Sequence, residues 1–194
     1  MNERLENIAE AFRVAEMKEL PGVCDRVIRN WKDIPVEPLL ELKLKLARLG
    51  LEHREAHLDE ALVSVAEKRP EPFSAIASDT DHPLWKPAVE IMSLSENPKF
   101  QDQLLSLLPD CPKRSLGDLI RAISRSGKNA ESIWPYLMDE DEGVFLEAVM
   151  AVRGAGGQES VRRLKDAMAQ KKKEGSPSAR VLEAVLHEIE RNQD

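Results

Sequence analysis

Apolar residues recur every three or four positions along most of the chain, the spacing that places them on one face of an α-helix. In the first half, this pattern predicts helices that end before Pro21, near residue 31, at Gly50 and at Pro70, with a short helix over residues 72–77. Gly50 is expected to be the residue at which the chain leaves the third helix. Aromatic residues make up only 4% of the chain, and no hairpin signal separates alternating segments, so no sheet is expected.

The second half of the chain repeats a pattern of two helices. The first aligned set comprises residues 89–92, 120–123 and 149–152, with offsets of 31 and 29 residues. The second set comprises residues 104–107, 133–136 and 164–167, and small or polar residues separate the two helices of each pair. One helix pair cannot bury its own apolar face and has to stack on its neighbours, so this period is typical of a helical solenoid.

A motif in residues 132–164 points to one kind of repeat. A proline near the start of the second helix leads to an apolar pair, an acidic loop, a valine, an alanine-rich helix and a glycine turn. The residues at these places are Pro135, Leu137, Asp141, Val144, Ala148 and Gly156. The motif resembles the short HEAT-like repeats, including those of phycobilisome-lyase relatives. The arginine that often follows the valine in that family is Phe145 here, so the charged ladder of the family is broken at this repeat.

The resemblance implies an all-α fold, a right-handed superhelix of about nine to eleven helices. It covers residues 82–170, in which we expect three HEAT-like helix pairs, behind an N-terminal helical segment over residues 1–81 that is continuous with the array. Residues 176–194 follow a polar linker and are expected to form a helix that caps the last pair. The resemblance also implies that the second helices, expected over residues 98–108, 131–138 and 160–170, line the surface that holds a partner. Their inward-facing residues are expected to be Leu104, Leu107, Ile133, Leu137, Leu164 and Met168.

Charge and cysteine content narrow the class of protein. Lys and Arg number 28 against 35 Asp and Glu, which gives a net charge of −7 and argues against general binding to nucleic acid or anionic membranes. No apolar run approaches the ~20 residues that span a bilayer, and no signal peptide is expected. Cys24 and Cys111 match no metal or redox spacing, so we expect a reduced, cytoplasmic setting. A bacterial source is expected together with the family resemblance.

One pair of residues has a spacing that can chelate a metal. His53 and His57 lie four residues apart, which puts two imidazoles on one face of a helix. A third ligand could come from Asp59, Glu60 or His82, but no spacing fixes one of them, so we expect a metal-free pair on a polar helix face. No Ser/His/Asp or Cys/His arrangement can be proposed, and we therefore expect no catalytic residue and no cofactor.

Three short stretches resemble catalytic or phosphate-binding motifs in composition, but their context favours structural roles. Residues 154–157 are rich in glycine but follow a helix instead of a strand, so a turn that ends the helix is expected instead of a phosphate loop. Residues 124–129 contain a Gly-Lys pair without the rest of a nucleotide motif. Residues 139–142 are four consecutive acids in one environment, so we expect them to cap the following helix and not to form a catalytic pair.

Basic and aromatic side chains supply the candidate binding surface. Residues 162–173 form a basic stretch that acids interrupt, which favours a solvated helix face, with a phosphate backbone or an acidic partner as the alternative. The three tryptophans, Trp31, Trp85 and Trp134, belong either to the core or to a binding hot spot. The candidate binding residues are Trp85, Trp134, Arg121, Arg125, Arg162 and Arg163.

Three functions are compatible with this picture. The first is a non-catalytic cytosolic scaffold or adaptor that holds another protein. The second is an enzyme subunit like the phycobilisome lyases, which attach or detach a bilin and would need an acid/base or thiol site. The third is a DNA-repair glycosylase, since one family of alkylpurine glycosylases uses HEAT-like arrays. A glycosylase would need a basic concave groove, which the net charge of −7 argues against.

Overall fold

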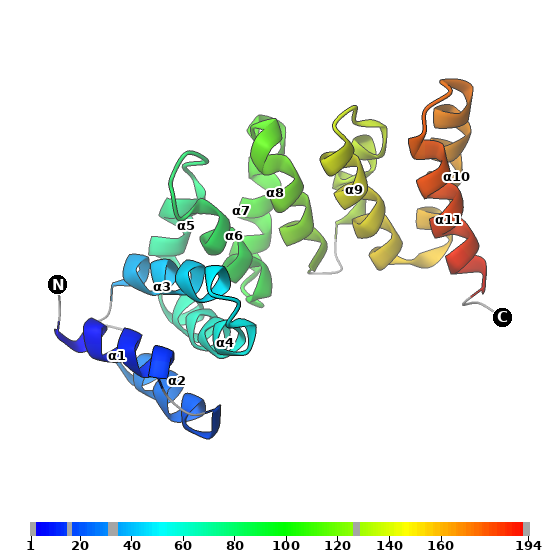
Figure 1. The fold of residues 1–194 in the computed structure, drawn as a ribbon. Coiled ribbons are helices and arrows are strands. Elements are labelled where there is room, and N and C mark those ends of the chain that lie inside the picture. The colour runs from blue at the N-terminus through cyan, green and yellow to red at the C-terminus, as the bar shows by residue number, and fades with distance from the viewer. Residues whose placement is uncertain (1–2, 15–16, 31–34, 126–128, 192–194) are drawn as a thin grey trace. The chain divides into compact units, whose positions relative to one another are not determined.

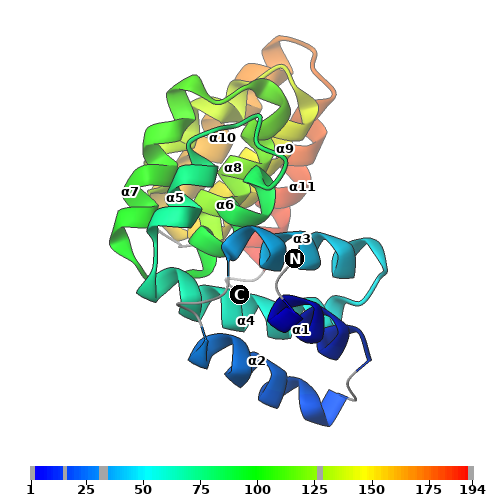
Figure 2. The ribbon, with the colours of Figure 1, turned by 90° about the vertical axis from the view of Figure 1, so that its left-hand side faces the viewer.

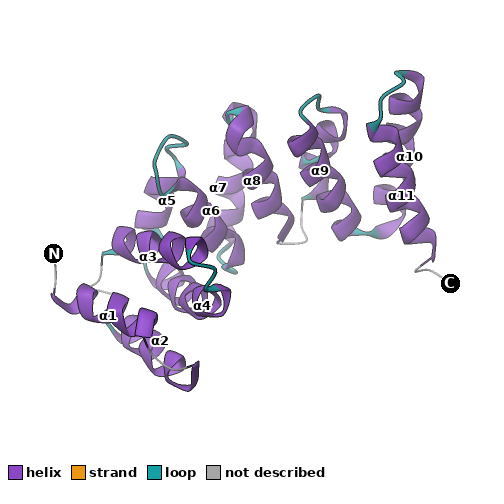
Figure 3. Ribbon diagram, in the orientation of Figure 1, coloured by secondary structure: helices purple, strands orange, loops and turns teal. Residues whose placement is uncertain are grey.

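A computed structural model describes residues 3–14, 17–30, 35–125 and 129–191 of the chain (Figure 1). Within these ranges it contains eleven α-helices, four short 3-10 helices and no strand (Figure 3). The all-α prediction is therefore confirmed. No helix in the described ranges is both long and apolar enough to cross a lipid bilayer. The chain divides into two compact units, residues 1–100 and residues 101–194, and each is described here by itself.

The N-terminal unit is a group of antiparallel helices around one apolar core. It contains η1 (Met17–Glu19), α1 (Glu3–Val14), α2 (Leu20–Arg29), α3 (Val36–Arg48), α4 (Glu52–Lys68), α5 (Glu71–Ala77) and α6 (Trp85–Leu94). Helix α4 packs against α2, α3 and α6, and Figures 1 and 2 both show α3 and α4 side by side. The largest fully buried side chains of this unit include Phe12, Leu40, Leu62 and Phe73.

Two helix ends in this unit test the sequence reasoning. Gly50 has a φ of +66°, and its N–H donates to the carbonyl of Ala47 while the N–H of Leu51 donates to Leu46, both at 3.0 Å. These two bonds form a Schellman motif, so the predicted end of the third helix is confirmed. Helix α2 begins at Leu20, and Pro21 fits its first turn, where the absent N–H of proline leaves no partner unsatisfied.

The C-terminal unit consists of helices that pack on their neighbours along the chain. Helix α7 (Pro98–Leu107) spans the boundary between the units, and the elements that follow it are η2 (Leu108–Asp110), α8 (Lys113–Arg125), η3 (Ala130–Ser132), η4 (Trp134–Met138), α9 (Glu142–Ala155), α10 (Gly157–Lys173) and α11 (Ser178–Arg191). Helix α8 packs on α9, and η4 packs on both α9 and α10.

The aligned segments of the sequence repeat fall on equivalent elements. The first set lies in α6, α8 and α9, and the second lies in α7, in η3 and η4, and in α10. The six residues expected to point inward are all buried or half-buried. One expectation is wrong: residues 131–138 form two 3-10 helices instead of an α-helix. Pro135 supplies no N–H, and the segment is held by i→i+3 bonds such as Tyr136 N–H to the carbonyl of Ile133 at 3.0 Å.

The remaining predicted turns and caps are as expected. The Asp141 carboxylate accepts a hydrogen bond from the N–H of Val144 at 3.0 Å and caps α9, which begins one residue later at Glu142. Gly156, with a φ of +67°, ends α9 and precedes α10, so the glycine-rich loop is a turn between two helices. Helix α11 packs on α10 and α9, and it buries Ala179, Leu182, Val185 and Leu186.

Candidate binding site

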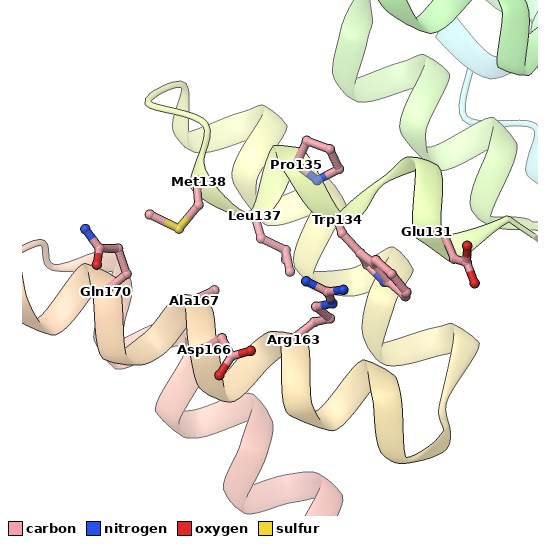
Figure 4. Close-up of a pocket in the computed structure, with 9 residues that line it drawn as sticks. All are labelled: Glu131, Trp134, Pro135, Leu137, Met138, Arg163, Asp166, Ala167 and Gln170. Carbon is pink, nitrogen blue, oxygen red and sulfur yellow. The ribbon is translucent and has the colours of Figure 1, made fainter.

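A pocket of about 440 Å³ lies between η4 and α10 in the C-terminal unit (Figure 4). Its lining consists of Glu131, Trp134, Pro135, Leu137, Met138, Arg163, Asp166, Ala167 and Gln170. In Figure 4, Met138 and Gln170 lie at one end, Glu131 lies at the other, and Trp134 and Arg163 lie between them. The pocket is therefore a groove between η4 and α10.

Local helix geometry explains why these side chains face one another. A 3-10 helix has three residues per turn, so Trp134 and Leu137 of η4 stand above one another on the same side. On α10, Arg163, Ala167 and Gln170 are spaced by four and three residues and share one face of the α-helix. The 3-10 form of η4, which Pro135 favours, thus brings an aromatic and an aliphatic side chain into one wall of the pocket.

Trp134 and Arg163 form the most distinctive contact in the pocket. The guanidinium carbon of Arg163 lies 4.3 Å from the centroid of the Trp134 ring, which is a cation–π geometry. The same guanidinium donates through Nε to a carboxylate oxygen of Glu159 at 2.9 Å. The indole nitrogen of Trp134 is buried and has no acceptor within the described part of the chain. A buried donor without an acceptor is rare in folded proteins.

The two arginines of α10 share one carboxylate on the same helix. Arg162 donates through Nε to Glu159 at 2.7 Å, and Arg163 donates to the same carboxylate. Hydrogen bonds from Arg162, followed by those from Arg163, lower the pKa of Glu159 to about 2. One carboxylate therefore compensates part of the positive charge of the two arginines, which lowers their attraction for an acidic partner.

Three lysines of the basic stretch also make contacts within the unit. Lys165 lies 3.3 Å from Glu190, and Lys172 lies 3.1 Å from Glu183. Lys171 is buried, with its ammonium 5.5 Å from the Phe145 ring and 3.3 Å from the carbonyl oxygen of Asp139. The interpretation as a solvated helix face holds for Lys165 and Lys172, and it is wrong for Lys171, which packs against α9.

The two carboxylates at the rim of the pocket are less closely paired with opposite charge than its arginine is. Glu131 is exposed and forms no ion pair with any described residue. Asp166 is also exposed, and its nearest cation, Arg162, lies 3.9 Å away. The pocket therefore combines an apolar wall of Trp134 and Leu137 with two acidic groups whose charge is not balanced at close range.

The structure separates the other candidate binding residues from this pocket. Trp85 is only 3% exposed, and its indole N–H donates to the carbonyl of Ala77 at 3.0 Å, so its assignment to a binding surface is wrong. Its ring fills the core between α5 and α6. Arg121 and Arg125 are exposed on α8 and do not line the pocket, and Arg121 pairs with Glu147 on α9. Trp31 lies outside the described residues.

The surroundings of the candidate histidine pair and of the two cysteines are defined by their neighbours and their burial. His53 is exposed, and the nearest acid to His57 Nδ1 is Glu60 at 3.7 Å. No group of three or more His, Cys, Asp or Glu side chains in the described ranges could hold a metal ion. Burial raises the pKa of the Cys24 and Cys111 thiols to about 11 each, so both are protonated at neutral pH and are poor nucleophiles.

Sequence reasoning missed one polar cluster, in the N-terminal unit. The ammonium of Lys43 on α3 lies 2.6 Å from Glu55 and 2.9 Å from Asp59, both on α4, and 3.4 Å from Glu90 on α6. The Lys43 side chain is only 4% exposed. Its position gave a signal, since residue 43 falls four residues after Leu39, on the apolar face of its helix. Because Lys43 is closed to solvent, the cluster ties three helices together and offers no access to a ligand.

Ionisation of this cluster follows from burial and from mutual charge. Burial opposes the charge on Lys43, but the hydrogen bond to Glu55 and the charges of Asp59 and Glu90 raise the pKa of Lys43 above its usual range. Burial raises the pKa of Asp59 and outweighs the attraction of Lys43. Lys43 is therefore positively charged at neutral pH, and all three carboxylates lie within ion-pair distance of its ammonium.

The pocket between η4 and α10 therefore stands out as the candidate site, because it brings together two residues singled out from the sequence, Trp134 and Arg163. Arg162 lies beside it on the same helix, and the remaining candidates lie elsewhere in the fold. A comparison with known proteins adds no further constraint. No protein-family model matches the sequence, and no curated protein matches it.

Proposed function

We propose that this protein is a non-catalytic scaffold or adaptor built on HEAT-like helix pairs, and that the pocket between η4 and α10 receives part of a partner protein. The repeat of the sequence and the motif in residues 132–164 support the HEAT-like assignment. The contacts of α8 with α9 and of η4 with α10 fit stacked helix pairs. In this proposal, η4 and α10 are both second members of their pairs. In HEAT-like arrays, the second members form the binding surface.

The observation that carries this proposal is the composition of the pocket. Its volume of about 440 Å³ falls in the range of about 300–1,000 Å³ that is common for binding sites. It has an apolar wall with a half-exposed tryptophan, and polar residues surround that wall. An apolar centre with a polar rim is the usual anatomy of a protein interface. Tryptophan and arginine are the residues most enriched at interface hot spots.

The two enzymatic alternatives receive less support. A bilin-lyase-like reaction would need an activated thiol or an acid/base pair, and the thiols of Cys24 and Cys111 have raised pKa values. A DNA glycosylase would need free positive charge in a groove, and the arginine of this pocket is bound to Glu159. We therefore propose no catalytic activity and no cofactor.

Two further parts of the proposal concern the setting of the protein. Cys24 and Cys111 are both free thiols, which suits the reducing conditions of the cytoplasm. We include a cytoplasmic location in the proposal on this basis. Its bacterial source rests on the resemblance to phycobilisome-lyase relatives.

A pair of matched variants tests the proposal. Met138 is 37% exposed at one end of the pocket, and Met150 is 53% exposed on α9, outside it. Replacing either with Glu adds the same charge at an exposed position of the same unit. Tagged wild-type protein, Met138→Glu and Met150→Glu would each be purified from the native host, and bound proteins would be quantified by mass spectrometry.

We expect a partner that binds the wild type and Met150→Glu in equal amounts and that Met138→Glu loses. Thermal melting of all three proteins verifies that the loss is not due to unfolding. If Met138→Glu retained every partner of the wild type, the pocket would not be the binding surface.

A further inference from the structure

We infer that the pocket between η4 and α10 binds a protein segment in which an apolar side chain stands next to an arginine or a lysine. This inference rests on the proposed function and adds the chemistry of the partner. Three features of the pocket carry it: the balance of charge around it, the orientation of its arginine and the indole N–H that lacks an acceptor.

The charge balance favours a basic partner. The lining contains two carboxylates, Glu131 and Asp166, and one cation, Arg163. Arg163 is held twice, by Glu159 at 2.9 Å and by the face of the Trp134 ring at 4.3 Å. Glu131 has no ion-pair partner in the described ranges, and the nearest cation to Asp166 is 3.9 Å away. The charge that remains available at the rim is therefore negative, and opposite charge on the partner would complement it.

The arrangement also fixes where the two parts of the partner would lie. Arg163 already covers one face of the Trp134 ring, so the cation of the partner would pair with the rim carboxylates and not with that face. The apolar side chain would contact Leu137, Met138 and Ala167, which lie along the groove toward the Gln170 end (Figure 4). An apolar residue beside a basic residue matches this layout.

The indole nitrogen of Trp134 sets a further requirement. This N–H is buried and has no acceptor in the described part of the chain. A main-chain carbonyl of an extended partner segment is an acceptor that every peptide supplies. Binding would have to bring the acceptor to this nitrogen, which is closed to solvent in the free chain. We expect this hydrogen bond to form on binding, since an unsatisfied buried donor destabilises the free protein.

A random dodecapeptide library displayed on phage tests the inference with a defined probe. The library would be selected on the purified full-length chain and counter-selected on Met138→Glu. We expect enriched peptides that share an apolar residue adjacent to Arg or Lys. Reversing both rim charges, in Glu131→Lys combined with Asp166→Lys, should weaken these peptides about tenfold at low salt. The matched control is Glu140→Lys, at an exposed acid outside the pocket.

The indole N–H provides a second readout on the strongest selected peptide. In a ¹H–¹⁵N spectrum, Trp134→Phe identifies the Trp134 indole signal, and the Trp85 indole, bonded to Ala77, is an internal reference. We expect the Trp134 signal to move downfield on binding while the Trp85 signal stays in place. We also expect Trp134→Phe to bind about three- to tenfold more weakly, the effect of one lost hydrogen bond.

The outcomes separate the inference from the proposed function. Acidic or uncharged peptides that depend on Met138 would overturn the inference and leave the proposed function intact. A dimer of the free chain that Met138→Glu dissociates in sedimentation would also overturn it, because the occupant would be a second copy. Peptides that bind the wild type and Met138→Glu equally, or no enriched peptide at all, would overturn both. Should Met138→Glu fail to fold, Met138→Ala replaces it in the counter-selection.

Discussion

Replacing Lys43 with Met should strongly destabilise the N-terminal unit. The change removes the ammonium that Glu55, Asp59 and Glu90 share, and it leaves three carboxylates close together with side chains that are only 21%, 20% and 26% exposed. Methionine keeps the length and apolar stem of the side chain, so little packing is lost. The expected effect is therefore electrostatic.

The magnitude follows from the burial of the cluster. Breaking a buried ion pair by removing one partner costs about 3–5 kcal/mol. We expect the lower end, about 3 kcal/mol, because the carboxylates remain partly solvated. For a unit of this size, about 1 kcal/mol lowers the melting temperature by roughly 4–8 °C, so about 3 kcal/mol should lower it by roughly 12–24 °C.

Denaturant and thermal melts of the full chain measure this loss. The matched control is Lys45→Met on the same helix, where the lysine is exposed, and it should change the free energy of unfolding by less than about 0.5 kcal/mol. If Lys43→Met melted like Lys45→Met, the cluster would contribute no stability. Our account of Lys43 as the link between α3, α4 and α6 would then be refuted.

The pH dependence gives the prediction a second test. The pKa of Lys43 is raised above its ordinary value of 10.5, so its stabilisation is complete below pH 10.5 and is lost as the pH rises through the higher folded pKa. In Lys43→Met, the three carboxylates repel one another in the folded state, and their protonation at low pH relieves this repulsion. The deficit relative to the wild type should therefore be largest at neutral pH and should shrink below about pH 5.

Three further predictions concern stability elsewhere in the fold. Deleting residues 177–194 should expose the side of α10 and α9 that α11 covers. The free energy of unfolding should fall by several kcal/mol, at ~1.5–3 kcal/mol for each large buried side chain such as Leu182. An unchanged melting temperature would contradict this. Asp141→Ala should lower the free energy of unfolding by about 1 kcal/mol in a denaturant melt, and Asp141→Asn should lower it much less, since only asparagine keeps an acceptor for the Val144 N–H. Equal losses in the two variants would show that the cap is unimportant. Trp85→Phe should lower stability by about 1 kcal/mol more than Trp134→Phe, because only the Trp85 N–H is bonded; a larger loss for Trp134→Phe would contradict that difference.

Much of the fold could be predicted from the sequence because it depends on local rules. The apolar spacing of residues 39–46 places one face of α3 in the core, and Gly50 ends that helix by a motif that needs only a positive φ. Asp141 caps its helix through a contact three residues away. The 3-10 form of η4 was missed, because the same apolar spacing fits an α-helix and only the main-chain hydrogen bonds distinguish the two.

The candidate site was predicted only in part, because it depends on contacts between distant residues. Trp134 and Arg163 were both candidates, but their contact requires η4 to pack on α10, and spacing along the chain does not specify that packing. Trp85 and Trp134 have similar positions near the starts of their helices, yet one is core and the other lines a pocket. The neutralisation of Arg162 by Glu159 is local, at three residues' distance, and could have been anticipated from helix geometry.

The most direct test of the binding pocket is photo-cross-linking in the native host. A benzophenone amino acid would replace Met138, at the end of the pocket, or Met150, on the exposed face of α9. Illumination should join the chain to one partner protein from position 138 and not from position 150, with a peptide containing an apolar and a basic residue at the cross-link. A cross-link to the same partner from position 150 alone, or from neither position, would contradict the assignment of this pocket as the partner-binding site.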